Sequence, residues 1–224
     1  MNPRLLALGI VLGGAAGASV TLPDGGSSPW KAVADRVHSS VIEVHGEEGV
    51  NIVSSGTGVL IGHGLAITTL HAVALPSASG KLTPLRDVRV LVPDLGPLDA
   101  RVMAGAPDLD LAILQLSDQG AALSGAPLAT DPPAEGDVLV AMGAGDDEIT
   151  ALGVVVSAVS GDLFALASKR MIDSRFWGGP LFDAEGRLVG IQLTSLGSSR
   201  AISARVIQRM LDERPVSPGS PAPP

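Results

Sequence analysis

Short apolar segments separated by glycine-rich turns follow one another through the middle of the chain, and this pattern limits the fold more than any other feature. The segments are rich in Val, Ile and Leu and are bounded by turn residues, which favours β-strands. The predicted strands cover residues 41–44, 58–61, 65–68, 88–92, 111–116, 138–142, 153–157, 163–166, 180–182 and 188–191. Only residues 30–37 and 204–211 have a helical pattern. Many short strands and few helices predict an all-β barrel or sandwich.

Two turns, one strand and one loop can be predicted in more detail. Gly62-His63-Gly64 separates two strands and has the composition of a hairpin turn. Residues 183–186 form a second such turn. The segment 111–116 is apolar almost throughout, so we expect it to be buried on both faces. Residues 117–136 are rich in Gly and Pro and predict a loop.

The composition agrees with a β protein that has a hydrophobic core. The 224 residues include 28 glycines and 17 prolines, which suits a loop-rich β protein better than a helical bundle. Hydrophobic residues make up 46% of the chain and charged residues only 17%, which argues against disorder. With two Trp, three Phe and no Tyr, the core must consist mainly of Val, Leu, Ile and Ala.

Charge and residue usage exclude several classes of function. The net charge of −8 disfavours binding to nucleic acid or to an anionic membrane surface by bulk electrostatics. The chain has no cysteine, which excludes disulfides, cysteine-ligated zinc and thiol catalysis. His38 and His45 have no partner at the spacing of metal ligands, so we expect no metal and no cofactor.

The two ends of the chain differ from its middle. Arg4 precedes an apolar run, and Ala16-Gly17-Ala18 has the small residues of a cleavage site, which is the pattern of a secretory signal. The uncharged stretch is shorter than the roughly 20 residues of a spanning helix, so we expect cleavage, with a retained membrane anchor as the alternative. The predicted organisation is a signal peptide over 1–18, a linker over 19–29, a folded domain over 30–213 and a disordered Pro-rich tail over 214–224. We therefore expect an exported bacterial protein, periplasmic or extracellular.

Three segments contain the residue types of acid–base and nucleophilic chemistry, in a fixed order along the chain. His71 stands at the end of an apolar strand, in Thr68-Thr69-Leu70-His71-Ala72-Val73. Asp110 stands at the start of the buried segment 111–116. The third segment is a turn, Arg175-Phe176-Trp177-Gly178-Gly179-Pro180. His, then Asp, then a Gly-Gly-Pro turn is the chain order of the chymotrypsin-type triad, which needs a base, an orienting carboxylate and a nucleophile beside an oxyanion hole.

From about residue 37 to residue 212 the chain resembles the trypsin-like serine proteases, in particular their bacterial HtrA (Deg) branch. Residues 55–61, Ser-Gly-Thr-Gly-Val-Leu-Ile, resemble the Gly-Ser-Gly-hydrophobic opening of that branch. Residues 67–73 resemble its Leu-Thr-Asn-Asn-His-Val-Val, and residues 110–114 its Asp-Leu-Ala-Val-Leu. Residues 136–158 and 201–203 are similar to its Gly-Asp…Gly-Ile-Val-Ser and Ala-Ile-Pro segments. The resemblance implies an all-β fold of two six-stranded antiparallel β-barrels and a short C-terminal helix, with catalytic positions at His71, Asp110 and residue 177.

The chain departs from that family at the nucleophile. The family motif reads Gly-Asn-Ser-Gly-Gly-Pro, and here Trp177 stands where the serine would be, after Arg175 and Phe176. An indole has no hydroxyl to acylate or to give up a proton to His71. Because Arg175 brings a Cβ into a turn where the family has glycine, we expect a remodelled oxyanion loop, consisting of Arg175, Phe176, Gly178 and Gly179. In subtilisin, loss of the serine lowers kcat by a factor on the order of 10⁶, so the sequence predicts an inactive homologue that binds a peptide or protein.

Two alternative functions stay open at this point. One is an active serine endopeptidase with a non-standard nucleophile such as Ser174, although a shift of three residues along a turn disturbs its alignment with His71. The other is a structural or interaction domain without a function in the cleft, in which Phe176 and Trp177 belong to the core. In an inactive protein, His71 and Asp110 would only hold two strand ends together. The partner is not named by the sequence, and a homo-oligomer stays open.

Overall fold

The computed structural model describes residues 29–78, 80–146, 148–169, 173–193 and 199–213. The predicted signal peptide, the tail, and all of the linker except its last residue lie outside these residues. None of the helices in the described ranges is both long and apolar enough to span a membrane.

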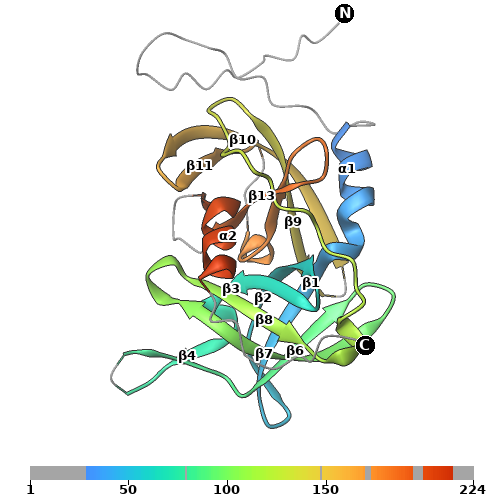
Figure 1. Ribbon diagram of the computed structural model, residues 1–224, viewed down its shortest axis with the longest axis vertical. Helices are drawn as coiled ribbons and strands as arrows, with labels where there is room; N and C mark the ends of the chain where they lie inside the picture. Colours follow the sequence, from blue (N-terminus) through green and yellow to red (C-terminus); the bar gives the residue numbers. More distant parts are fainter. Residues whose placement is uncertain (1–28, 79, 147, 170–172, 194–198, 214–224) are drawn as a thin grey trace, which may run out of the picture.

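The first barrel is closed by six antiparallel strands in the order β1-β2-β3-β8-β7-β6 (Figure 1). These strands are β1 (Val41–Glu48), β2 (Asn51–Gly62), β3 (Leu65–Thr69), β6 (Asp87–Val92), β7 (Gly96–Ala106) and β8 (Leu111–Leu116). Buried and more exposed residues alternate along β6, and Val88, Val90 and Val92 point into the barrel interior. β3 is buried along its whole length because one face lines the barrel and the other packs against the rest of the protein. A small sheet of β4 (Ala74–Pro76) and β5 (Leu82–Pro84) projects from this barrel (Figure 1).

The second barrel is closed in the order β10-β11-β14-β13-β12-β9 and lies above the first in Figure 1. Its strands are β9 (Val138–Gly145), β10 (Glu148–Ser160), β11 (Leu163–Ala167), β12 (Pro180–Phe182), β13 (Leu188–Leu193) and β14 (Arg200–Ser203). Two helices complete the fold, α1 (Pro29–Val37) before the first barrel and α2 (Ala204–Asp212) after the second. Ser203 caps α2 by accepting a hydrogen bond from the Arg205 backbone N–H, which satisfies one donor of its first turn.

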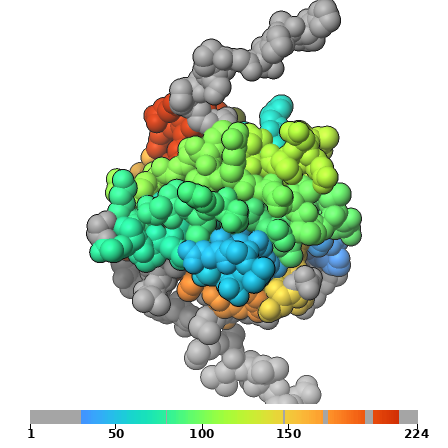
Figure 2. Space-filling model, turned by 90° about the horizontal axis from the view of Figure 1, so that it is seen from below, coloured from blue at the N-terminus to red at the C-terminus, as the bar shows by residue number. Residues whose placement is uncertain are grey.

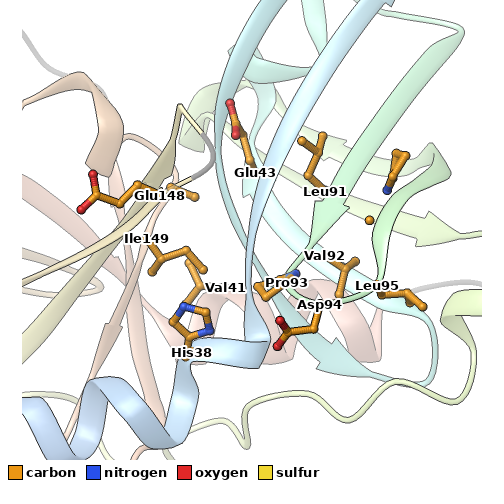
Figure 3. A pocket seen from close by; sticks show the side chains of 13 residues that line it. His38, Val41, Glu43, Leu91, Val92, Pro93, Asp94, Leu95, Glu148 and Ile149 are labelled. Carbon is orange, nitrogen blue, oxygen red and sulfur yellow. The ribbon is translucent and has the colours of Figure 1, made fainter.

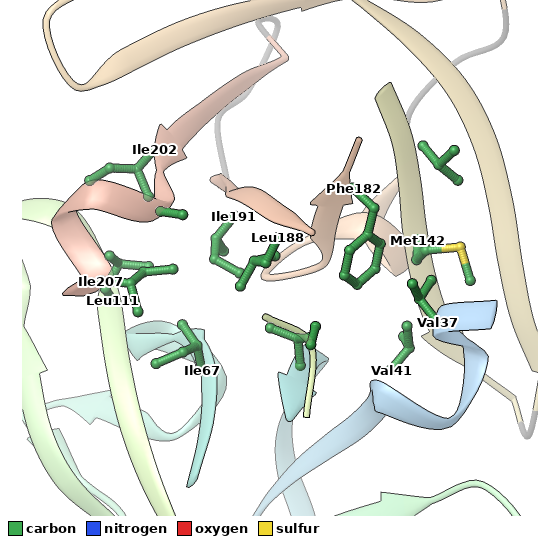
Figure 4. Packing of buried hydrophobic residues seen from close by; sticks show 14 of the residues in the cluster. Val37, Val41, Ile67, Leu111, Met142, Phe182, Leu188, Ile191, Ile202 and Ile207 are labelled. Carbon is green, nitrogen blue, oxygen red and sulfur yellow. The ribbon is translucent and has the colours of Figure 1, made fainter. Parts of the chain in front are cut away.

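A hydrophobic cluster joins the two barrels (Figure 4). From the first barrel it contains Ile67 and Leu111, and from the second it contains Met142 and Ile191. The helices close it from the sides, with Val37 of α1 and Ile207 of α2 among its members. Each buried Å² of apolar surface stabilises the packing by roughly 25 cal/mol. The cluster therefore fixes the two barrels against each other, and with them the side chains at their junction.

The predicted fold class, two six-stranded antiparallel barrels with a short C-terminal helix, is confirmed. The segment 111–116 is buried on both faces as predicted, apart from the partly exposed Gln115. Strand β7 escaped prediction because its sequence, GPLDARVMAGA, contains Gly, Pro and Ala and is largely exposed, so it has no apolar alternation. The small β4–β5 sheet and β14 also escaped prediction, since three- and four-residue strands give too short a pattern.

The β1–β2 turn stands out on the outer face of the first barrel, where Figure 2 shows it in blue. Val50 at its tip is 98% exposed, and Ile52 beside it is exposed as well. This turn connects β1 and β2 and extends them beyond their buried residues.

Candidate functional site

His71 and Asp110 meet where two paired strands of the first barrel end. His71 lies in the 3-10 turn η2 (Leu70–Ala72), directly after β3, and Asp110 directly precedes β8. Since Thr69 of β3 pairs with Leu111 of β8, the sheet brings the two residues side by side. Asp110 has a φ of 50°, a left-handed conformation that Asp tolerates better than most residues.

The carboxylate of Asp110 holds His71 at two points. Its Oδ2 lies 2.8 Å from Nδ1 of the imidazole, and its Oδ1 accepts a hydrogen bond of 3.0 Å from the His71 backbone N–H. Because a carboxylate only accepts hydrogen bonds, the neutral ring in this arrangement has its proton on Nδ1. This is the orientation in which a carboxylate prepares an imidazole to act as a base through Nε2.

Trp177 faces this pair. Its ring centroid lies 6.1 Å from that of His71, with the two ring planes at 74°, an edge-to-face arrangement. The indole is half-buried, so it is neither a core side chain nor a freely exposed one. An aromatic ring without a hydroxyl therefore lies against the imidazole of His71.

Phe176, the neighbour of Trp177, points the other way. It is 3% exposed and belongs to the hydrophobic cluster inside the second barrel, with Leu139 and Leu181. The expectation for a purely structural domain placed both aromatic residues in the core, and the structure places only Phe176 there. Phe176 ends the 3-10 turn η5 (Ser174–Phe176), so its burial anchors this turn to the second barrel.

Two backbone N–H groups of the oxyanion loop already have partners. The N–H of Arg175 donates to Oδ1 of Asp173 at 3.0 Å, and the N–H of Trp177 donates to the Ser174 carbonyl at 3.1 Å. An oxyanion hole needs such groups aimed at the position of a developing negative charge. In the chymotrypsin-type triad, the two donors are the N–H of the nucleophile and that of the residue two positions before it. Both corresponding donors of this chain, on Trp177 and Arg175, are used within the turn.

The Arg175 side chain reinforces this arrangement. Its Nη2 lies 2.9 Å from Oδ2 of Asp173. The hydrogen bond to Asp173, and then the negative charge of that carboxylate, raise the pKa of the Arg175 guanidinium. The same carboxylate thus binds both the backbone and the side chain of Arg175 and holds the turn in its observed form.

Gly178 and Gly179 let the turn pass close to other backbone segments. Gly178 has a φ of +76°, and a Cβ there would lie 2.4 Å from the Thr57 carbonyl. At Gly179 a Cβ would lie 2.1 Å from the Met142 carbonyl. Both positions therefore require glycine, for conformation and space at the first and for space at the second.

Thr57 joins the first barrel to this loop, a role that the sequence analysis did not assign to it. Its buried hydroxyl donates to the Arg175 carbonyl at 2.6 Å and accepts from the Ala144 N–H at 2.7 Å. Its backbone N–H donates to the Trp177 carbonyl at 2.9 Å. The one sequence signal is a polar residue between two glycines, Gly56 and Gly58, in a strand that is otherwise apolar toward its end.

The remaining candidates lie elsewhere or have other partners. Nε2 of His45 lies 2.8 Å from Oε1 of Glu43 on the same strand. Ser174 begins η5 as an exposed residue. Across the described ranges, no three His, Asp or Glu residues gather as potential ligands of a metal ion.

Comparisons with known proteins agree with this architecture. Residues 56–191 match the family model of the trypsin-like peptidase domain. No curated protein gives a significant match. The serine endoprotease from Yersinia pestis is similar in structure, with 20% identity, a TM-score of 0.69, and coverage of 85% of this chain and 67% of that chain.

Two further similar structures are inactive forms. The Rv3671c protease in its inactive form has 21% identity and a TM-score of 0.67, covering 87% of this chain and 98% of that chain. A serine-to-alanine mutant of Rv3671c from M. tuberculosis H37Rv has 20% identity and a TM-score of 0.65, covering 88% of this chain and 100% of that chain. These likenesses concern the fold, while the family model spans more than half of the chain. This chain therefore belongs to the trypsin-like peptidase domain family.

Proposed function

We propose that this protein is an inactive member of the trypsin-like family, exported from a bacterial cell, that acts by binding a peptide or another protein. The observation that carries the proposal is the ring of Trp177, which lies edge-to-face against His71 at 6.1 Å. We assign Trp177 to the nucleophile position from its place before the Gly-Gly-Pro turn. An indole offers no oxygen for an acyl-enzyme and no acidic proton for the imidazole to remove.

The oxyanion loop supports the same proposal independently of the nucleophile. Stabilisation of a tetrahedral intermediate needs preorganised donors, and removal of one such donor lowers kcat by about 10²–10³. The N–H groups of Arg175 and Trp177 are both engaged within the turn, by Asp173 and Ser174. An activity based on another nucleophile would therefore also need this turn to rearrange.

Binding is proposed because the framework around the site is intact while the chemistry is lost. A half-buried indole is an amphipathic aromatic surface, the type of side chain that contributes most at protein interfaces. Peptides selected against the protein should bind the Trp177→Ala variant at least about tenfold more weakly, as expected for an aromatic anchor of about 2 kcal/mol. Equal affinities for the parent protein and for Trp177→Ala would contradict a role of this site in binding.

Labelling with a fluorophosphonate tests the loss of activity. The parent protein should remain unlabelled and should not cleave casein, because the side chain of Trp177 has no hydroxyl to attack the phosphorus or the peptide carbonyl. Trp177→Ser should be labelled slowly, because Asp173 still holds the Arg175 N–H. Adding Asp173→Ala should accelerate the labelling, because it frees that donor for the phosphonyl oxygen.

Two controls make the labelling result decisive. Labelling of the parent that disappears in His71→Ala would overturn the proposal and show a working hydrolase. If Ser174→Ala also abolished that labelling, Ser174 would be the nucleophile. Export is tested separately by N-terminal sequencing of the protein from cell fractions, where an intact residue 1 in the cytoplasmic fraction would contradict it.

A further inference from the structure

A pocket of about 470 Å³ is lined by residues of both barrels (Figure 3). His71, Asp110 and Trp177 are not among its lining residues. Its walls come from the start of β1, the β6–β7 turn and the β9–β10 hairpin. Glu43 of β1 pairs with Leu91 of β6, so both stand on the outer face of the first barrel. Ile149 of β10 closes the opposite wall, beside Val41 and His38 (Figure 3).

The lining combines apolar walls with negative charge. Glu43, Asp94 and Glu148 are among the residues that line the pocket, and none of the lining residues is Lys or Arg. Leu91 and Ile149, which are both partly exposed, provide apolar surface between these charges. Such walls suit a ligand that has a cationic end and an aliphatic stem.

Glu43 is the least exposed of the three acidic residues that line the pocket. Its side chain is only 16% exposed, and Oε1 lies 2.8 Å from Nε2 of His45. Its Oε2 has no hydrogen-bond partner within the part of the chain that the structure describes. A partly buried carboxylate oxygen without a partner favours a ligand that brings a hydrogen-bond donor with positive charge.

We propose that this pocket binds an Arg or Lys side chain of an extended peptide segment in a partner protein. The stem of that side chain packs between Leu91 and Ile149, and the charged end reaches the carboxylates. Leu95 on the rim is 51% exposed and provides apolar surface outside the pocket for the residues that flank the basic side chain. The net charge of −8 adds a long-range attraction for a basic segment.

Calorimetry with a capped peptide, Ac-Ala-Leu-Arg-Leu-Ala-NH₂, tests the proposal on the full chain. The matched probe replaces Arg with citrulline, which keeps the shape but has no charge. We expect saturable binding of one Arg peptide per chain, weakened by added salt because part of the attraction is screened. The citrulline peptide should bind at least roughly tenfold more weakly, as for the loss of a charge-assisted hydrogen bond.

Variants locate the binding on the protein. Glu43→Gln and Glu148→Gln should each weaken the Arg peptide roughly fivefold, in line with single charge pairs near a surface. Asp118→Asn is the matched control, since Asp118 lies in the turn η4 (Asp118–Gly120) and does not line the pocket. Leu95→Ser changes only an exposed rim residue, so it tests the apolar contact even if Glu43→Gln folds poorly.

Four results would overturn the proposal. They are the absence of Arg-peptide binding, equal binding of the citrulline peptide, equal losses in Asp118→Asn and Glu148→Gln, and an unchanged affinity in Leu95→Ser. Binding of agmatine, a free guanidinium with an aliphatic stem, as tightly as the peptide would show a small amine as the ligand instead of a peptide. None of these results depends on whether the protein is catalytically inactive, because the pocket shares no residue with the site at His71.

Discussion

At the scale of single residues, the adjacent side chains of Phe176 and Trp177 have different roles. Phe176 fills the interior of the second barrel, whereas Trp177 turns toward His71 and stays half-buried. The 3-10 turn before Trp177 and the extended conformation at Trp177, with φ −67° and ψ 124°, direct the two side chains to opposite sides. Trp177 can therefore be substituted without removing a side chain from the hydrophobic core.

Asp110 stabilises the junction of β3 and β8 whatever the chemistry of the site. Asp110→Ala removes the acceptor of two hydrogen bonds from His71 and places alanine at a positive φ. We expect the free energy of unfolding to fall by about 2 kcal/mol, since hydrogen bonds to charged groups contribute most and the site is partly exposed. Urea unfolding monitored by circular dichroism measures this loss.

Asp110→Asn is the control for that experiment. Asparagine tolerates a positive φ and keeps one acceptor oxygen, so its loss of stability should be about half as large. Equal stability of Asp110→Ala and the parent would show that the pair does not hold the two strand ends together.

At the scale of elements, the turn from η5 to β12 is fitted into a narrow space between β2 and β9. The Gly178 N–H donates to the Gln192 carbonyl, and the Gly179 N–H donates to the Phe176 carbonyl, both at 2.9 Å. The turn is thus tied to the second barrel on one side while the Thr57 N–H binds it from the first barrel. Its position depends on close approach of backbone to backbone.

Gly178→Ala and Gly161→Ala separate the effect of space from the effect of conformation. Both glycines have a positive φ, but a Cβ at Gly161 meets nothing within 4 Å, whereas at Gly178 it meets the Thr57 carbonyl at 2.4 Å. We expect Gly161→Ala to lower the free energy of unfolding by about 1 kcal/mol, and Gly178→Ala by at least about 3 kcal/mol. Thermal unfolding of the two variants, compared at matched conditions, gives the difference. Similar losses in both would mean that the turn can move away from β2.

At the scale of the whole molecule, the barrels are joined by an apolar cluster and by the hydrogen bonds of Thr57. Thr57 is fully buried, and its hydroxyl bonds to Arg175 and to Ala144 of the second barrel. A small shift of one barrel relative to the other would break these hydrogen bonds. The site at His71 and the turn with Trp177 are therefore kept together by the same contacts that join the barrels.

Thr57→Val tests this junction with a nearly isosteric change. It leaves the Ala144 N–H and the Arg175 carbonyl without the Thr57 hydroxyl, so we expect a loss of about 2–4 kcal/mol in the free energy of unfolding. Thr69→Val is the matched control, because the buried Thr69 hydroxyl has no hydrogen-bond partner in the described part of the chain. It should be neutral or stabilising, and a larger loss for Thr69→Val than for Thr57→Val in chemical unfolding would refute this account.

The sequence by itself determined most of the longer strands, the two helices and the order of the motifs. Alternation along β6 and the continuous apolar run of β8 are local patterns, and each reports which faces of a strand are buried. The presence of Trp177 directly before the Gly178-Gly179-Pro180 turn is likewise visible without a structure. The same local reasoning missed β7, because an exposed strand with Gly and Pro has no such pattern.

Only the tertiary structure decided how these parts meet. The engagement of the Arg175 and Trp177 N–H groups depends on backbone geometry in the turn, which residue types do not specify. The role of Thr57 depends on groups 87 and 118 residues away, and the acidic pocket on the packing of two barrels. Contacts at such separations arise from the closure of both sheets and the burial of their shared apolar cluster, so no local pattern in the chain contains them.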